Sequence, residues 1–247
     1  YFYKFLLEPD FIQQMIDTPT KEPNFTYEQH FVDSGIVRKR TGDYSLTLIQ
    51  DQPIFAKLQY RDHKLFFRFA GSFFGQRGQF RAQEIIPLKD GYRLHYHAQQ
   101  GYIRPFEEKP PTAKWREMDH SKRERVCVQH FDVNIDFRFS NTTLTVDLHT
   151  AGSENVPVKL ELLLPSGGIY STNDTVLFGK PSDYVFLKQG SCEYKFQDHR
   201  KFRIHGGFYK HHYGSTMRGS LGTDANLFTI VMTGFTPIQQ QLTITAE

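Results

Sequence analysis

The sequence has only two cysteines and no long apolar run, and each of these shortages argues against a class of protein. The two cysteines, Cys127 and Cys192, form no CxxC pair and have no zinc-like spacing to histidine. We interpret them as buried free thiols, or as one disulfide if their strands are neighbours. No apolar stretch approaches the ~18 residues that a membrane helix needs, so we predict no membrane span.

Strong charge of either sign is also lacking. The chain has 30 Lys and Arg against 27 Asp and Glu, a net charge of +3 across its 247 residues. The basic residues are dispersed along the chain rather than gathered in one stripe. This pattern does not indicate a nucleic-acid partner.

Signatures of common enzymes are missing as well. There is no G-x-S-x-G motif, and "GSFFGQRG" (71–78) resembles a Gly-rich phosphate loop only loosely, with no helix predicted after it. Two carboxylates for glycoside hydrolysis cannot be singled out among 27 acidic residues. We predict no cofactor, and whether the chain is an enzyme stays open.

Aromatic residues are abundant, with 23 Phe and 13 Tyr, and they suit the half-buried surface of a sheet. From Gly35 onward apolar residues recur with a period of two. "FDVNIDFRF" (131–139) and "TTLTVDLHT" (142–150) alternate throughout, and the turn at Ser140–Asn141 predicts a hairpin. Helical crossovers are absent, which excludes a parallel α/β sheet. We predict an all-β fold, a large antiparallel β-sandwich of more than ten strands, with a barrel as the other solution.

One short helix is predicted near the N-terminus, over Glu8–Asp17, with Asp10 as its cap. The chain begins with Tyr1 rather than Met, which suggests a mature or trimmed chain or a piece of a longer protein. We assign residues 1–34 to a helix and linker, the tail of an upstream domain, and residues 35–247 to a single sandwich domain. The segment Arg104–Lys122 is predicted to be a long loop that crosses the sandwich surface.

A row of polar and aromatic residues is predicted on one strand, Arg203–Tyr213. Its outward positions are Arg203, His205, Gly207, Tyr209, His211 and Tyr213. Ring faces and hydrogen-bond donors of this kind suit sugars, whose rings have apolar C–H faces and hydroxyl edges. Gly206 and Gly207 could instead kink the strand and redirect the residues after them. A solvent-facing strand with incidental aromatics is the other interpretation.

The catalytic candidates come from that row, and the ligand-binding candidates come from the row, from the turn after it and from the predicted long loop. Tyr209, His211 and His205 are the candidate catalytic residues, with Tyr or His removing a proton beside a uronate carboxylate that Arg218 neutralises. The candidate ligand-binding residues are Arg203, Tyr213, Arg218, Trp115, His120 and Arg123. Trp115 lies on the predicted long loop, where it could stack on a sugar or equally fix the loop to the sandwich.

A metal site is not assigned. His95 and His97 share one strand face and could converge on one ion, but they need at least one more ligand, and the sequence does not place one. The polar face of an antiparallel sheet is the simpler interpretation.

The overall pattern from Gly35 to Glu247 resembles the C-terminal β-sandwich of two-domain bacterial polysaccharide lyases, and "DSGIVRKRTGDYSLTL" (33–48) resembles a strand that follows the helical toroid in those proteins. In those heparinase, chondroitinase and alginate-lyase types, a helical toroid precedes the sandwich. The resemblance implies a carbohydrate-facing module with an upstream helical domain as partner. No catalytic motif of that group matches residue by residue, so no catalytic role is carried over.

We therefore expect an extracytoplasmic module, secreted, periplasmic or at the cell surface, that binds or helps process a polysaccharide or oligosaccharide, acidic glycans included. If it is an enzyme, it would be a polysaccharide lyase or hydrolase. The alternative is a non-catalytic interaction or assembly module whose aromatic surface packs against another domain or chain.

Overall fold

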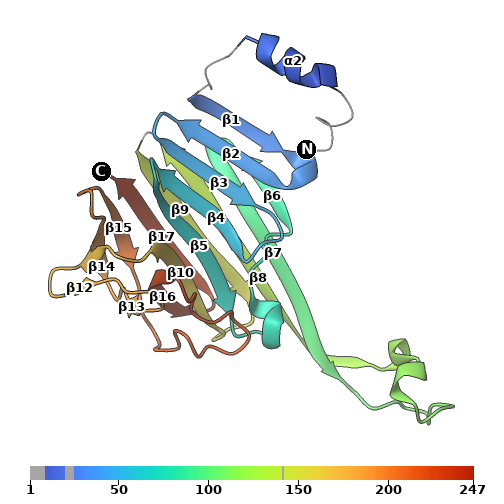
Figure 1. Ribbon diagram of the computed structural model, residues 1–247. Coiled ribbons are helices and arrows are strands. Elements are labelled where there is room, and N and C mark those ends of the chain that lie inside the picture. The colour runs from blue at the N-terminus through green and yellow to red at the C-terminus, as the bar shows by residue number, and fades with distance from the viewer. Residues whose placement is uncertain (1–8, 20–24, 141) are drawn as a thin grey trace.

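Two large sheets packed face to face make up the fold of the computed structural model, which describes residues 9–19, 25–140 and 142–247 (Figure 1). The eight-stranded sheet runs β1 (Thr26–Phe31), β2 (Ile36–Thr41), β3 (Tyr44–Ile49), β4 (Ile54–Tyr60), β5 (His63–Gly71), β10 (Pro157–Pro165), β16 (Leu227–Phe235) and β13 (Tyr184–Phe186). The nine-stranded sheet runs β12 (Val176–Phe178), β11 (Ile169–Ser171), β14 (Gly190–Lys195), β15 (Lys201–Gly207), β17 (Ile238–Ala246), β9 (Thr143–Gly152), β8 (Arg125–Ser140), β7 (Gly91–Ile103) and β6 (Glu84–Leu88). The predicted antiparallel β-sandwich is confirmed, and β13–β16 is a parallel pair.

The apolar residues that alternate along the strands form the core between the two sheets. The inward residues of β8, from Phe131 to Phe139, are buried between the sheets. The residues that alternate with them lie on the outer face of the nine-stranded sheet. Phenylalanine rings from both sheets interlock there: Phe67 and Phe137 meet edge to face with centroids 5.5 Å apart. The predicted β8–β9 hairpin is present, with Ser140 opposite Thr143, while Asn141 lies outside the described residues. Cys127 is exposed and Cys192 is buried, and both are free thiols.

The N-terminal region differs in detail from its prediction. The helix α2 spans Pro9–Asp17, so Asp10 lies in its first turn rather than at its cap, and Glu8 is outside the described residues. Residues assigned to a linker form β1, which pairs along its whole length with β2, so the sheet begins at Thr26. Its mostly exposed side chains lack the alternation that would have revealed an edge strand. None of the described helices has the length and apolar character needed to span a bilayer.

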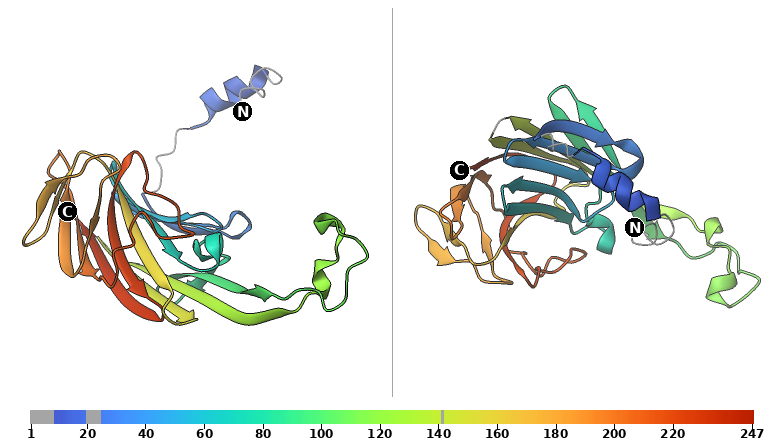
Figure 2. Two further views of the ribbon diagram at one scale, coloured as in Figure 1. Left: turned by 90° about the horizontal axis from the view of Figure 1, so that it is seen from below. Right: turned by 45° about the horizontal axis from the view of Figure 1, so that its top comes forward.

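Strands β7 and β8 extend past both sheets as an arm, defined here as residues 99–130 (Figure 2). Strand β6 accompanies β7 only to His95, and β9 accompanies β8 only from Phe131, so the distal ribbon has two open edges. The two short 3-10 turns η3 (Trp115–Glu117) and η4 (His120–Lys122) form its tip. The prediction that Arg104–Lys122 crosses the sandwich surface is wrong, because the long strands carry it away from the sandwich.

Residues 208–226 pass from β15 in one sheet to β16 in the other without forming a strand, and we call them the crossing segment. Phe208 packs into the core, and from Gly214 to Gly222 the segment lies against the outward side chains Lys159 of β10 and Arg68 of β5. Tyr209 makes a single parallel bridge to Thr233, and the Thr233 hydroxyl donates to the His211 carbonyl at 2.6 Å. The opening residues of this segment are thus tied to β16.

Candidate functional site

The predicted row on Arg203–Tyr213 does not form one strand. Strand β15 ends at Gly207, and Gly206 has φ +103° with its Cα so near the Gln241 carbonyl that a Cβ would lie 2.2 Å from that oxygen. Arg203 and His205 point outward from the nine-stranded sheet, and Arg203 pairs with Glu193 at 2.8 Å. The residues after Gly207 lie against the other sheet, so the glycines redirect the chain and the predicted continuous strand is wrong.

His211 is buried rather than presented to a ligand, with 6% of its surface exposed. Its Nε2–H donates to the Val158 carbonyl at 3.1 Å, and its Nδ1 accepts from the Tyr213 amide at 3.2 Å. Burial lowers its pKa below the ordinary value. Both ring nitrogens are therefore occupied by the backbone, and the neutral ring fixes the crossing segment.

Tyr209 and Tyr213 take different surroundings. The Tyr209 ring meets Phe186 edge to face at 5.3 Å, with the Lys188 ammonium 5.1 Å from its centroid. Tyr213 is 42% exposed and lies beside the His211 ring. The structure thus separates His205 from Tyr209 and His211, the three candidate catalytic residues, onto the outer faces of different sheets.

A buried ionic cluster, unnoticed in the sequence, holds the crossing segment in place. Glu161 receives two hydrogen bonds from Arg68, at 2.6 and 3.1 Å, and one from Lys159 at 2.9 Å. The cations also donate to the segment: Lys159 to the carbonyls of Gly214 and Leu221, Arg68 to that of Gly222. Desolvation lowers the pKa of Lys159. The signal in the sequence was a pair of charges alternating with leucines in "VKLELLL" (158–164).

Arg218 lies in the middle of the stretch that this cluster holds, and it faces a hollow at the base of the arm. The hollow has a volume of about 630 Å³ and is lined by Phe73, Phe74, Gln100, Tyr102, Gln129 and Arg218, with Ser72, Gly75 and Val156. A second hollow of about 550 Å³ shares Phe74 and is lined by Asp51, Arg77, Gln79, Arg81, Gln83 and Tyr96. We call the two together the arm-base cleft.

The loop between β5 and β6 places the ring of Phe74 between these hollows. Phe74 and Gly75 both have left-handed backbones, with φ of +40° and +68°. Phe73 stacks on the core residue Phe131 at 5.4 Å, while Phe74 meets Tyr102 of the arm edge to face at 5.6 Å. A non-glycine residue in this conformation is uncommon and occurs preferentially at functional sites.

The cleft carries an excess of positive charge. The guanidinium groups of Arg77 and Arg218 are exposed and make no ion pair or hydrogen bond with any described residue. Arg81 lies 4.0 Å from Asp51, the single carboxylate among the residues that line the cleft. The Tyr96 hydroxyl donates to the Arg77 carbonyl at 2.5 Å, and burial raises the pKa of Tyr96. Cations and rings therefore meet in one open site.

Trp115, His120 and Arg123 come together at the arm tip, away from that cleft. The Arg123 guanidinium lies 5.3 Å from the Trp115 ring, and His120 Nε2 bonds the Trp115 carbonyl at 2.8 Å. The Trp115 ring is 62% exposed. These three residues therefore form a cluster, but they contact one another and the arm tip rather than the arm-base cleft.

His95 and His97 point outward from β7, as predicted, and each bonds a neighbour on β8. The Nδ1 atoms contact Asn134 at 2.9 Å and Asp132 at 2.5 Å. In the described part of the chain no group of three or more His, Cys, Asp or Glu side chains has the arrangement of a metal site.

Comparison with known proteins does not place the chain in a family. No family model and no curated protein matches it. A solved structure, the Slr1438 protein from Synechocystis sp. PCC 6803, is similar at 8% identity and a TM-score of 0.41, covering 93% of this chain and 99% of that one.

Proposed function

We propose that the chain is a carbohydrate-binding β-sandwich that holds an acidic polysaccharide in the arm-base cleft. The observation that carries this proposal is the pair of guanidinium groups, Arg77 and Arg218, that have no partner among the described residues and lie beside the rings of Phe74 and Tyr102. An arginine pairs with a carboxylate or sulfate through two parallel hydrogen bonds. The ring faces suit the C–H face of a sugar, and the amides of Gln100 and Gln129 suit its hydroxyls.

The cleft supports binding more directly than turnover. Its lining residues offer arginines, amides and rings, with Asp51 as the one carboxylate. The candidate catalytic residues of the sequence lie elsewhere, and His211 has no free ring nitrogen. Lyase or hydrolase activity, an upstream helical partner and an extracytoplasmic location stay predictions of the sequence.

Replacing Arg218 by alanine is expected to lower the affinity for acidic polysaccharides about 10-fold or more, because a hydrogen bond to a charged group contributes about 1.5–3 kcal/mol. Affinity electrophoresis and calorimetry with polygalacturonate, alginate and chondroitin sulfate measure it. Lys195→Ala removes the same charge from an exposed residue of β14 and should leave the affinity unchanged. Added salt should weaken the wild-type complex. No binding to any acidic polysaccharide, or equal binding by Arg218→Ala, would contradict the proposal.

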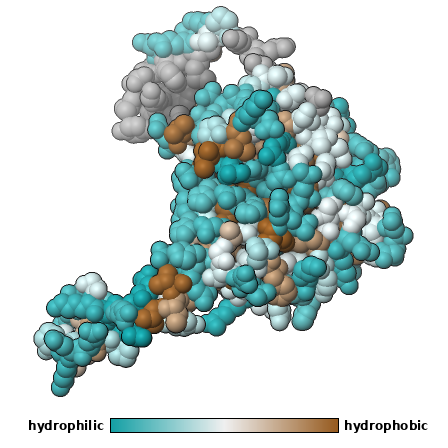
Figure 3. Space-filling view, turned by 180° about the vertical axis from the view of Figure 1, so that it is seen from behind, coloured by the Kyte–Doolittle hydropathy of each residue, from teal (hydrophilic) through white to brown (hydrophobic). Residues whose placement is uncertain are grey.

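The arm favours a second candidate function, assembly with a second copy of the chain. Tyr102, Ile103, Trp115 and Val128 are 41–64% exposed on a ribbon with two open edges. Figure 3 shows apolar side chains gathered on the arm between the sandwich and its hydrophilic tip. Open edges pair with other strands, and two arms can pair around a two-fold axis.

Shortening the arm is expected to abolish that assembly. Gln100 and Gln129 are paired, so Asn-Gly can replace residues 101–128, which include the four exposed apolar residues, as a two-residue turn. Light scattering should give a dimer for the wild-type chain and a monomer for the shortened one. Trp115 is the single tryptophan, so its emission should shift to the blue as the wild-type concentration rises. A wild-type monomer whose emission stays that of an exposed indole would exclude this assembly.

A further inference from the structure

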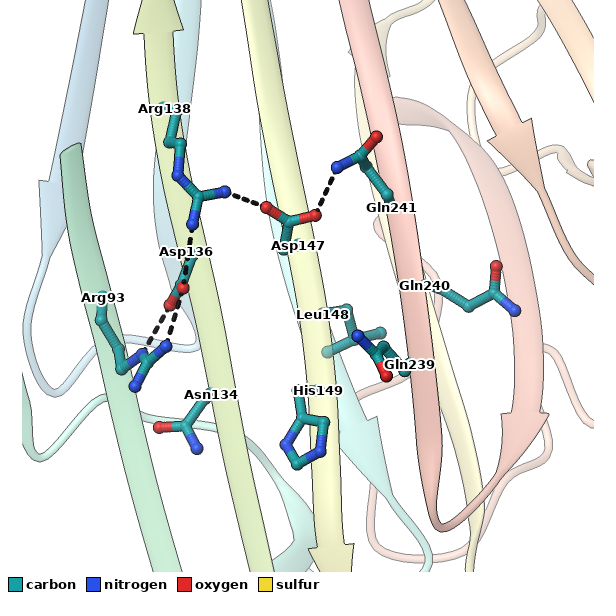
Figure 4. Close-up of a pocket in the computed structure, with 10 residues that line it drawn as sticks. All are labelled: Arg93, Asn134, Asp136, Arg138, Asp147, Leu148, His149, Gln239, Gln240 and Gln241. Carbon is teal, nitrogen blue, oxygen red and sulfur yellow. Dashed lines mark hydrogen bonds and ion pairs between the residues drawn. The ribbon is translucent and has the colours of Figure 1, made fainter. Parts of the chain in front are cut away.

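A network of polar side chains crosses the outer face of the nine-stranded sheet, apart from the arm-base cleft. Arg93, Asp136, Asp147 and Gln241 stand opposite one another on β7, β8, β9 and β17. Arg93 donates to both oxygens of Asp136, at 2.7 and 2.8 Å, and Gln241 donates to Asp147 at 2.7 Å. Figure 4 shows Arg138 lying between the two aspartates and bonding both.

The adjacent row has side chains free for a ligand. It consists of His95, Asn134, His149 and Gln239 on the same four strands. His95 bonds Asn134, but the exposed side chains of His149 and Gln239 make no hydrogen bond or ion pair within the described residues. Apart from His95, both rows line one hollow of about 800 Å³ (Figure 4).

The charges of this hollow compensate each other. Two guanidinium groups, of Arg93 and Arg138, face two carboxylates, of Asp136 and Asp147. Asp136 is only 6% exposed, so the network is held in place rather than free to reorient in water. An anion entering the hollow would meet the aspartates, and a cation would meet the arginines. An uncharged ligand rich in hydroxyl groups can use the donors and acceptors of both.

We propose that this hollow is a binding site for a neutral glycan, separate from the cleft and independent of the proposal made for it. His149 and Gln239 provide the free hydrogen-bonding groups, and Asn134 adds its amide N–H. The ion pairs hold in place the polar surface of the sheet against which a sugar chain would lie. The groups held by the ion pairs are fixed before a ligand arrives, which favours affinity, and the imidazole of His149 has only two torsions to fix on binding.

The experiment uses the full chain and a panel of neutral glycans: starch, xylan, β-glucan, galactomannan and their hexasaccharides. The wild-type chain should bind at least one of them, and His149→Ala and Gln239→Ala should each lower that affinity about 2- to 10-fold, as expected for one neutral hydrogen bond. The double variant should lose binding. Both side chains are exposed, so circular dichroism should be unchanged.

Two control variants separate this site from the arm-base cleft. Arg218→Ala should leave neutral binding intact, and the His149 variant should leave acidic binding intact. The proposal is overturned if no neutral glycan binds, if the His149 and Gln239 variants bind like the wild-type chain, or if Arg218→Ala abolishes neutral binding as well.

Discussion

Replacing Glu161 by glutamine is expected to lower the free energy of unfolding by about 3–5 kcal/mol, the range found when one partner of a buried ion pair is removed. Glu161 is 1% exposed and is the carboxylate shared by Arg68 and Lys159, which are themselves 5% and 0% exposed. The amide of glutamine would leave two buried cations without an opposing charge. Urea unfolding followed by circular dichroism measures the loss.

The surface ion-pair group around Glu193 provides the matched control for the buried cluster. Glu193→Gln removes a carboxylate that also contacts one lysine and one arginine, Lys201 and Arg203, but these side chains are partly exposed. Screening by water limits such pairs to about 0–1 kcal/mol. A Glu161→Gln loss no greater than that of Glu193→Gln would show that the buried cluster does not stabilise the fold.

The same variant connects stability with the candidate site. The cluster bonds carbonyl oxygens at Gly214, Leu221 and Gly222, on both sides of Arg218. Arg68, Lys159 and Glu161 are therefore positioning residues for Arg218. Under conditions where the variant is still folded, its affinity for acidic polysaccharides should also fall.

The sandwich could be predicted because most strands show, within their own sequence, an alternation of apolar and polar residues. In β8 the residues from Phe131 to Phe139 alternate between core and surface, and a period of two has this one structural meaning. Edge strands such as β1 lack a buried face, so nothing in Thr26–Phe31 revealed its pairing with β2.

The site could be predicted only in part, because its residues come from segments that are distant in the sequence and are brought together only by the tertiary fold. The alternation of Arg203–Tyr213 was read through Gly206, where contact with the Gln241 backbone turns the chain. Position 211 is buried because Val158 and Thr233 lie beneath it, and no local pattern contains that information.

Arg218 was predicted as a ligand-binding residue, but its neighbours were not. Phe74 lies in the segment 71–78, which resembled a phosphate loop only loosely, and Tyr102 lies at the start of the arm. They meet because β5 ends beside the point where β7 and β8 leave the sandwich. Adjacent glycine, phenylalanine and arginine in "GSFFGQRG" were the available signal, and they become informative only once the arm is placed.

Replacing Gly219 by alanine is the second variant for which we expect a large effect. At this residue the crossing segment packs directly against the backbone of Gly75, in the loop that carries Phe74. Gly219 has φ +82°, a conformation that costs an L-residue about 1–2 kcal/mol. A Cβ at this position would also lie 2.1 Å from the Gly75 carbonyl oxygen, so one of the two backbones must move. We expect a loss of about 2 kcal/mol or more in the free energy of unfolding.

Gly222→Ala is the control on the same segment, since its φ is not in the left-handed range and no described residue beyond its chain neighbours has an atom within 4 Å of the position a Cβ would take. It should be nearly neutral in unfolding and in binding. Gly219→Ala should separate Arg218 from Phe74 and Tyr102, so acidic-polysaccharide affinity should fall about as far as in Arg218→Ala, while neutral-glycan affinity at the His149 hollow stays unchanged. If Gly219→Ala lost stability but kept its affinity for acidic polysaccharides, then the approach of the two loops would serve folding alone, and the ligand would have to bind without the ring of Phe74.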